Sequence, residues 1–160
     1  MAGLPQDHAA IPVWNSEDWC FEDFVIGDKI RSIRRTIAEG ESMMFNSLVM
    51  DHHPYVSDET FAREEGVFGR RLVAGAFVFS LGLGLAATNC LNSFSYGYDR
   101  LRFIKPVFIG DTIRARVTVK EKREHKKPGH GVVSELVEVF NQHDETVLAC
   151  EHLLLVRKKS

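Results

Sequence analysis

The sequence predicts an α+β fold in which a curved antiparallel β-sheet wraps around one long central helix. Residues 72–91 are apolar almost all round, which is typical of a helix that is buried on every side. Four runs of alternating polarity follow between residues 95 and 157, as in half-buried strands. Turn-forming residues separate these runs, so we expect consecutive strands to be antiparallel.

Composition indicates one domain and a cytoplasmic protein. A length of 160 residues fits a single domain, which we place at residues 21–160 behind an N-terminal arm at residues 1–20. The net charge of −2 gives no overall attraction to nucleic acid or to anionic membranes. The first residues lack the apolar core of a secretory signal, and the apolar stretch at 72–87 is shorter than the roughly 20 residues that cross a bilayer. We therefore expect no nucleic-acid partner and no membrane partner.

The three cysteines, Cys20, Cys90 and Cys150, are far apart and lack the spacing of metal ligands. An odd number at such spacing indicates neither a disulfide framework nor a zinc site. We therefore expect reduced cysteines and no bound metal.

The domain is expected to begin with an irregular strand and an amphipathic helix. Residues 21–37 hold a Gly-Asp turn and then isoleucines among basic residues, which favours an exposed strand over a helix. Over residues 39–50, Met43, Met44 and Leu48 recur at helical spacing, which places them on the apolar face of a helix.

Residues 51–66 are expected to end this helix and form a shorter one. The sequence Asp51-His52-His53-Pro54 ends the first helix, because the residue before a proline is disfavoured in the α region. Ser57 is expected to cap a second helix that runs through Glu65 and stops at Gly66.

The strands that follow the central helix are expected at about residues 95–104, 111–122, 131–141 and 146–157. In the strand at 111–122, isoleucine, alanine and valine alternate with threonine and arginine. The sheet is therefore expected to have one apolar face and one solvent-exposed face.

The segment DRLRFIKPVFIGDTIRARVTV at residues 99–119 joins two alternating runs through Pro106 and Gly110. It resembles the signature segment of the MaoC-like dehydratases, the family of (R)-specific enoyl-CoA hydratases built on the hotdog fold. The resemblance covers roughly residues 21–158. It implies the hotdog fold, with its long central helix wrapped by a curved antiparallel sheet.

A second motif of that family, D-x-N-P-x-H-x-D, is similar to residues 51–58 of this chain. Asp51 occupies the family position, but His53 stands where the family has asparagine. Val56 stands where the family has its catalytic histidine. Further along, Ala74 precedes Gly75 where the family has a His-Gly pair.

The resemblance implies that water adds across the double bond of a trans-2-enoyl-CoA thioester. Asp51 is then the acid or base. His53 can point to the same side of an extended segment as Asp51, so it either takes over proton transfer or only fills the structural role of the asparagine. Gly75 at the positive end of the central helix either donates its N–H to the thioester oxygen, or permits close packing, or does both.

The resemblance also implies an acyl-CoA binding site near these residues. Tyr55, Val56, Ala74 and Phe77 are expected to contact the substrate, although Phe77 also suits plain core packing. The basic segment at 120–127 is either a solvated hairpin end or a cradle for coenzyme A phosphates. No metal or other cofactor is needed for this chemistry.

Three functions remain open from the sequence: an enoyl-CoA hydratase or dehydratase, a catalytically degenerate acyl-CoA-binding subunit, and a hotdog thioesterase. We also expect a homodimer or a higher even oligomer, because one hotdog unit leaves sheet edges that invite pairing. Phe94, Tyr96 and Tyr98 alternate on the first strand after the helix, where a partner or the chain's own core would bury them.

Overall fold

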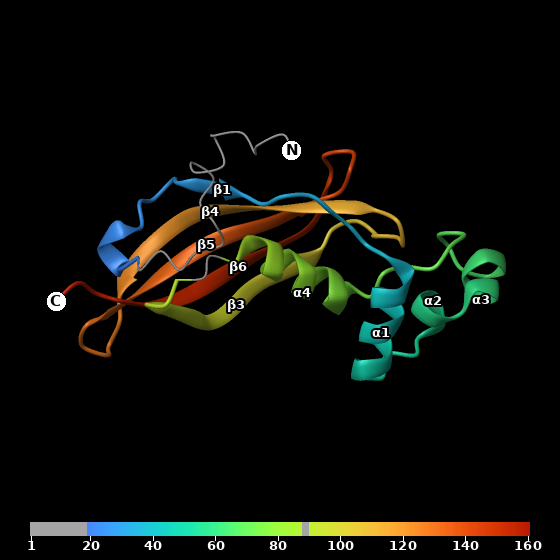
Figure 1. Cartoon of the computed structure of the whole chain (residues 1–160), viewed down its shortest axis with the longest axis horizontal. Helices are drawn as coiled ribbons and strands as arrows, with labels where there is room; N and C mark the ends of the chain where they lie inside the picture. Colours follow the sequence, from blue (N-terminus) through green and yellow to red (C-terminus); the bar gives the residue numbers. More distant parts are fainter. Residues whose placement is uncertain (1–18, 88–89) are drawn as a thin grey trace, which may run out of the picture.

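A computed structural model describes residues 19–87 and 90–160 (Figure 1). The described residues form a six-stranded antiparallel sheet in the order β1-β4-β5-β6-β3, with β2 also paired to β4. The strands are β1 (Lys29–Arg31), β2 (Arg35–Thr36), β3 (Ser93–Phe103), β4 (Thr112–Glu124), β5 (His130–Phe140) and β6 (Thr146–Arg157). The helices are a 3-10 turn (Phe21–Asp23), α1 (Glu39–Val49), α2 (Pro54–Ser57), α3 (Glu59–Glu64) and α4 (Gly75–Ala86).

Helix α4 lies across one face of the sheet, and α1, α2 and α3 group beyond its N-terminal end (Figure 1). The predicted α+β hotdog arrangement is therefore confirmed, and the four long strands fall within about two residues of the predicted ranges. The irregular first strand is also confirmed, since β1 and β2 both pair with β4 and are separated by a break. Most of the predicted N-terminal arm, residues 1–18, lies outside the described residues.

The central helix is shorter than predicted. Leu72 and Val73 are extended because Leu72 bridges Phe108 and the Val73 N–H donates to the Val107 carbonyl, so backbone pairing holds them out of the helix. The helix is also not buried on every side. Ala76, Ser80 and Gly84 share an exposed face, because α4 packs on the sheet with only one side.

The close packing of α4 on the sheet depends on Gly82. A Cβ at this position would lie 2.5 Å from the Val139 Cγ2 on β5. The absence of a side chain therefore lets the helix backbone approach the strand. Buried valines and isoleucines from α4, β4, β5 and β6 form the main apolar cluster beneath the helix.

Helix α1 occurs where it was predicted, but its apolar face was placed wrongly. Met44 and Leu48 are exposed, and the buried positions are Ser42 and Asn46. Asn46 Nδ2 donates to the Val56 carbonyl of α2 at 3.5 Å. The position of α2, and not the hydrophobicity of the α1 side chains, therefore decides which side of α1 is buried.

The short helix predicted after residue 57 is two helices in the structure. Ser57 ends α2, and its hydroxyl donates to the carbonyl of His53 at 3.0 Å. Asp58 caps α3 in its place, because the Asp58 carboxylate accepts from the Phe61 N–H at 2.9 Å. The predicted cap residue was therefore off by one.

Candidate active site

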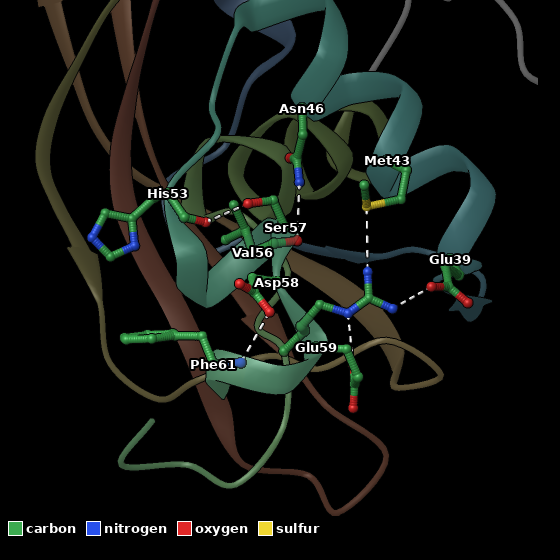
Figure 2. A network of polar contacts seen from close by, with 10 residues as sticks. Glu39, Met43, Asn46, His53, Val56, Ser57, Asp58, Glu59 and Phe61 are labelled. Atoms are coloured by element: carbon green, nitrogen blue, oxygen red, sulfur yellow. Dashed lines mark hydrogen bonds and ion pairs between the residues drawn. The ribbon is translucent and has the colours of Figure 1, made fainter. Parts of the chain in front are cut away.

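The candidate site is built on residues 50–75, which connect α1 to α4 (Figure 2). Arg71 holds this connection together, because its guanidinium bonds Glu39 at the start of α1 and Glu59 at the start of α3. It also donates to Met43 Sδ at 3.4 Å. The hydrogen bond to Glu39, followed by the one to Glu59, raises the pKa of Arg71, so the Arg71 guanidinium stays charged.

Asp51 lies directly after α1, where the chain leaves the helix. Met50 adopts a left-handed backbone at φ 59°, and the Asp51 N–H donates to the Asn46 carbonyl at 2.9 Å. The Asp51 side chain is half-buried, and its Oδ1 accepts from the backbone N–H of His53 at 3.3 Å. The carboxylate is thus held by backbone contacts and retains an oxygen for further chemistry.

His53 performs a helix-capping role in the structure. Its Nδ1 accepts from the backbone N–H of Tyr55 at 3.3 Å, as an asparagine oxygen would at the same position. The ring stacks on the Tyr55 ring. Figure 2 shows the His53 ring pointing away from Val56. Within the described residues no hydrogen bond joins the His53 ring to the Asp51 carboxylate.

Three predicted substrate-contacting residues, Val56, Ala74 and Phe77, lie together in the main apolar cluster. Phe77 stacks on Phe45 with ring centroids 4.8 Å apart. Tyr55 lies apart from them and is half-buried, with its hydroxyl accepting from the Val67 N–H at 3.4 Å. The structure therefore groups the two positions that replace family histidines in one apolar environment.

Two buried oxygen atoms on α1 lack partners within the described residues. They are the Ser42 hydroxyl and the Asn46 Oδ1, and Asn46 is only 2% exposed. The amide of Asn46 reaches the backbone of Val56. An unsatisfied buried acceptor is costly, so a polar group beside Val56 would find a ready partner.

The N-terminus of α4 opens at a cavity of about 410 Å³. Ala74 provides no side-chain cap, and Phe77 and Val78 take the Ala74 carbonyl as their acceptor. Gly75 lines the cavity, and a Cβ there would meet the Phe103 ring at 3.0 Å. The helix thus presents backbone N–H groups and its positive end beside an open space.

The cavity wall is mostly apolar and contains one charged residue. Phe68, Leu72 and Phe103 are among the apolar residues, and Lys105 supplies the positive charge. Lys105 bonds Glu145, and this bond holds the pKa of the Glu145 carboxyl below its usual value. Of the seven residues predicted as site residues, Gly75 is the one that lines this cavity.

The MaoC-like domain family is the family whose sequence profile matches residues 23–140. The chain belongs to this family. The match spans the capped loop at 51–58, the N-terminus of α4 and the strands that pack against it. The resemblance stated from the sequence is thereby confirmed at the level of the family.

Curated relatives of this MaoC-like domain include two enzymes of acyl-CoA chemistry. Mesaconyl-CoA hydratase of Cereibacter sphaeroides is 33% identical over 148 residues, which are 87% of this chain and 41% of that protein. Beta-methylmalyl-CoA dehydratase of Chloroflexus aurantiacus is 32% identical over 142 residues, which are 87% of this chain and 40% of that protein. The chain therefore spans about two fifths of the length of these relatives.

Solved structures share the same fold over nearly the whole chain. A monoamine oxidase regulatory protein from Archaeoglobus is 35% identical with a TM-score of 0.82, covering 89% of this chain and 96% of that chain. The (R)-hydratase of Pseudomonas aeruginosa is 25% identical with a TM-score of 0.72, covering 88% and 86%.

Sequence reasoning missed Phe103 and Lys105 as neighbours of the candidate site. Both belong to the signature segment at 99–119, so the signal was present in the sequence. Their position in the same cavity wall as Gly75 depends on how the end of β3 lies relative to α4, which no local pattern encodes. Among the described residues no cluster of His, Cys, Asp or Glu could hold a metal ion, and no helix is long and apolar enough to cross a membrane.

Proposed function

We propose that this MaoC-like domain is an acyl-CoA hydratase or dehydratase that adds or removes water across the 2,3 double bond of an enoyl-CoA thioester. The observation that carries the proposal is the uncapped N-terminus of α4 beside the 410 Å³ cavity. Backbone N–H groups at a helix start stabilise the negative charge that develops on a thioester oxygen. Relatives named as a mesaconyl-CoA hydratase and a beta-methylmalyl-CoA dehydratase support the reaction class.

Asp51 is the proton-transferring group in this proposal. Its carboxylate takes a proton from water as the hydroxyl oxygen bonds to C3 of the enoyl group. The electron pair of the double bond moves toward the thioester oxygen, which the Gly75 N–H binds. Protonated Asp51 then returns its proton to C2, so the carboxylate is regenerated. The reverse sequence removes water.

A second candidate is a catalytically degenerate acyl-CoA-binding subunit. The observation that favours it is the apolar packing of Val56 and Ala74, which stand where the family has histidines. Neither side chain can transfer a proton. Asp51 would then be a turn residue that holds the His53 N–H.

We further propose that the domain works in the cytosol as a homodimer or a higher even oligomer. β3 is an edge strand of the sheet, and Phe94 and Tyr96 on it are exposed in the single chain. Exposed strand edges and aromatic side chains are suited to pairing with a second copy.

The decisive experiment incubates the purified domain with crotonyl-CoA and, separately, with butyryl-CoA. Loss of the enoyl absorbance without release of free thiol supports the hydratase. Release of free thiol identifies a thioesterase, and binding without turnover identifies the degenerate subunit. Either of these two results would overturn the hydratase proposal.

Asp51→Asn is the matched test of the mechanism. We expect it to lower turnover by about 10²–10⁴-fold, as for loss of a general acid–base group. It should leave thermal stability nearly unchanged, because the amide oxygen can still accept from the His53 N–H. Asp28→Asn, in an exposed turn, is the control that should keep full activity. Turnover of Asp51→Asn within about threefold of the parent would remove Asp51 from the mechanism.

A further inference from the structure

Two cysteines that are far apart in the sequence lie close together in the fold. Cys20 directly precedes the 3-10 turn at Phe21–Asp23, and Cys90 lies in the segment that joins α4 to β3. The Sγ of Cys90 donates to the Trp19 carbonyl at 3.0 Å. In return, Nδ2 of Asn92 donates to the Sγ of Cys20 at 3.7 Å. Each cysteine therefore lies within one or two residues of a group that contacts the other.

The sulfur of Cys90 is near enough to the backbone of Cys20 for a covalent bond to be considered. The planar peptide bond holds the Trp19 carbonyl oxygen about 3 Å from the Cα of Cys20. Cys90 Sγ lies 3.0 Å from that oxygen, so it lies within about 6 Å of this Cα. The Cys20 sulfur is itself about 3 Å from its Cα, so rotation of the Cys20 side chain and a small backbone shift can bring the two sulfurs to the roughly 2 Å of a disulfide.

Hydrogen bonds fix the backbone on both sides of this pair. The Cys20 N–H donates to the Asp23 carboxylate at 2.9 Å, and the Asp23 N–H donates back to the Cys20 carbonyl at 2.9 Å. The Cys90 carbonyl accepts from the N–H of Ser93 at 3.1 Å and from its hydroxyl at 3.2 Å. The fold itself therefore sets the two cysteines beside each other.

The three cysteines differ in their access to solvent. Cys20 is half-buried, whereas Cys90 is 8% exposed and Cys150 is 1% exposed. Burial raises the pKa of the Cys150 thiol to about 11, so Cys150 stays protonated and inert at neutral pH. Redox-sensing cysteines are accessible and often lie next to a second cysteine that resolves the first adduct. Cys20 and Cys90 fit these two roles.

We propose that Cys20 and Cys90 form a reversible disulfide when the domain meets a small-molecule disulfide such as glutathione disulfide. Cys20 is the attacking thiol and Cys90 is the resolving thiol. In a reducing compartment such bonds are transient and redox-sensing. The bond closes a loop over residues 20–90, which contains helices α1–α4 and the whole candidate site at residues 50–75. Oxidation therefore restrains the part of the chain that carries the candidate site against unfolding.

The reaction consists of two thiol–disulfide exchanges. The thiolate of Cys20 attacks one sulfur of glutathione disulfide and displaces one glutathione, which takes up the proton that Cys20 released. Cys90 then gives up its hydrogen bond to the Trp19 carbonyl and attacks the Cys20 sulfur. The second glutathione leaves with the proton of Cys90. The two cysteines are thereby oxidised, and glutathione disulfide is reduced to two molecules of glutathione.

The proposal is tested by incubating the full chain with glutathione disulfide and digesting it under non-reducing conditions. We expect the intact mass to fall by two hydrogen atoms per chain. Peptide mass spectrometry should locate the bond between Cys20 and Cys90, and dithiothreitol should reverse it. The Tm of the oxidised chain should exceed that of the reduced chain by about 5–15 °C, because the bond closes a long loop.

Variants of each cysteine separate the roles of the two thiols. In Cys90→Ser, whose hydroxyl can still donate to the Trp19 carbonyl, Cys20 should stop at the mixed disulfide and carry one glutathione. In Cys20→Ser, the buried Cys90 should gain no adduct over the same time. Cys150→Val is the matched control and should oxidise as the parent does. Circular dichroism checks that each variant is folded.

Several results would overturn the proposal. They are a folded parent that keeps glutathione without linked peptides, a bond that involves Cys150 or a second chain, and an adduct on Cys90 in Cys20→Ser. Linkage without a rise in Tm would refute the restraint on the loop at residues 20–90. These readouts involve no acyl-CoA, so they stand whatever the crotonyl-CoA assay gives.

Discussion

Replacement of Val56 by histidine should convert the apolar side of the candidate site into a proton-transferring one. Val56 is 7% exposed and packs in the main apolar cluster with Ala74 and Phe77. The Asn46 amide lies beside its backbone, and the Asn46 Oδ1 is buried without a partner. A histidine N–H at position 56 would therefore have an acceptor within the same part of the core.

The expected cost to stability is small. A larger side chain in a packed core costs about 1–3 kcal/mol. A new hydrogen bond to the Asn46 oxygen returns about 0.5–1.5 kcal/mol, because it satisfies a buried acceptor. The net loss is then at most about 2.5 kcal/mol. For a chain of this length, Tm falls by about 2–4 °C for each kcal/mol, so the total decrease stays within about 10 °C.

The expected gain is in turnover. A general acid–base group is typically worth about 10²–10⁴-fold in rate, so Val56→His should hydrate crotonyl-CoA faster than the parent by about 10²-fold or more. Val56→Gln is the matched control, because glutamine can bond Asn46 but cannot transfer protons. If Val56→His is folded and yet no faster than Val56→Gln, position 56 does not face the reacting carbons, and the reasoning is refuted.

Three further predictions address the loop, the core and the assembly. His53→Asn should keep turnover and stability, because asparagine can cap α2 as His53 Nδ1 does. His53→Ala removes the cap, so denaturant unfolding should show a loss of about 0.5–2 kcal/mol in the free energy of unfolding. A large loss of turnover in His53→Asn would instead make His53 a catalytic residue. Burial raises the pKa of the Cys150 thiol from 9.0 to about 11, so the stability that comes from keeping this thiol protonated is complete below pH 9 and is lost as the pH rises toward 11. Cys150→Val should therefore flatten the fall in unfolding free energy measured between pH 9 and pH 11. An unchanged slope would contradict the raised pKa of Cys150. Light scattering at micromolar concentration should give twice the 18.1 kDa chain mass or an even multiple, and an active species of 18.1 kDa would refute the dimer.

The order and type of the elements could be predicted from the sequence because they depend on local periodicity. The alternation of apolar and polar residues in 112–119 appears in the structure as buried and half-buried positions along β4. The resemblance placed Gly75 at the positive end of the central helix, and α4 begins at Gly75, although the apolar pattern alone had started this helix at Leu72. The hotdog arrangement followed from these elements and from the resemblance at residues 99–119.

Packing between distant segments decided the rest. The buried face of α1 was predicted from Met44 and Leu48, yet the helix buries Ser42 and Asn46 because the residues around Val56 lie against that side. From the sequence, His53 could point to the same side as Asp51. In the structure the His53 ring caps α2, and the backbone N–H of His53 is the group that reaches the Asp51 carboxylate.

The clearest difference concerns polar side chains of β3, β5 and β6 near the C-terminal end of α4. Ser95, Glu135 and His152 are each unremarkable in the sequence, where they lie far apart on three different strands. The register of β5 with β6 sets Glu135 opposite His152, and the Ser95 hydroxyl on β3 lies 3.1 Å from His152 Nε2. The sequence by itself determined which segments become strands and which face of each is apolar. Only the tertiary structure decided which side chains meet across them, because cross-strand register depends on all the paired segments together.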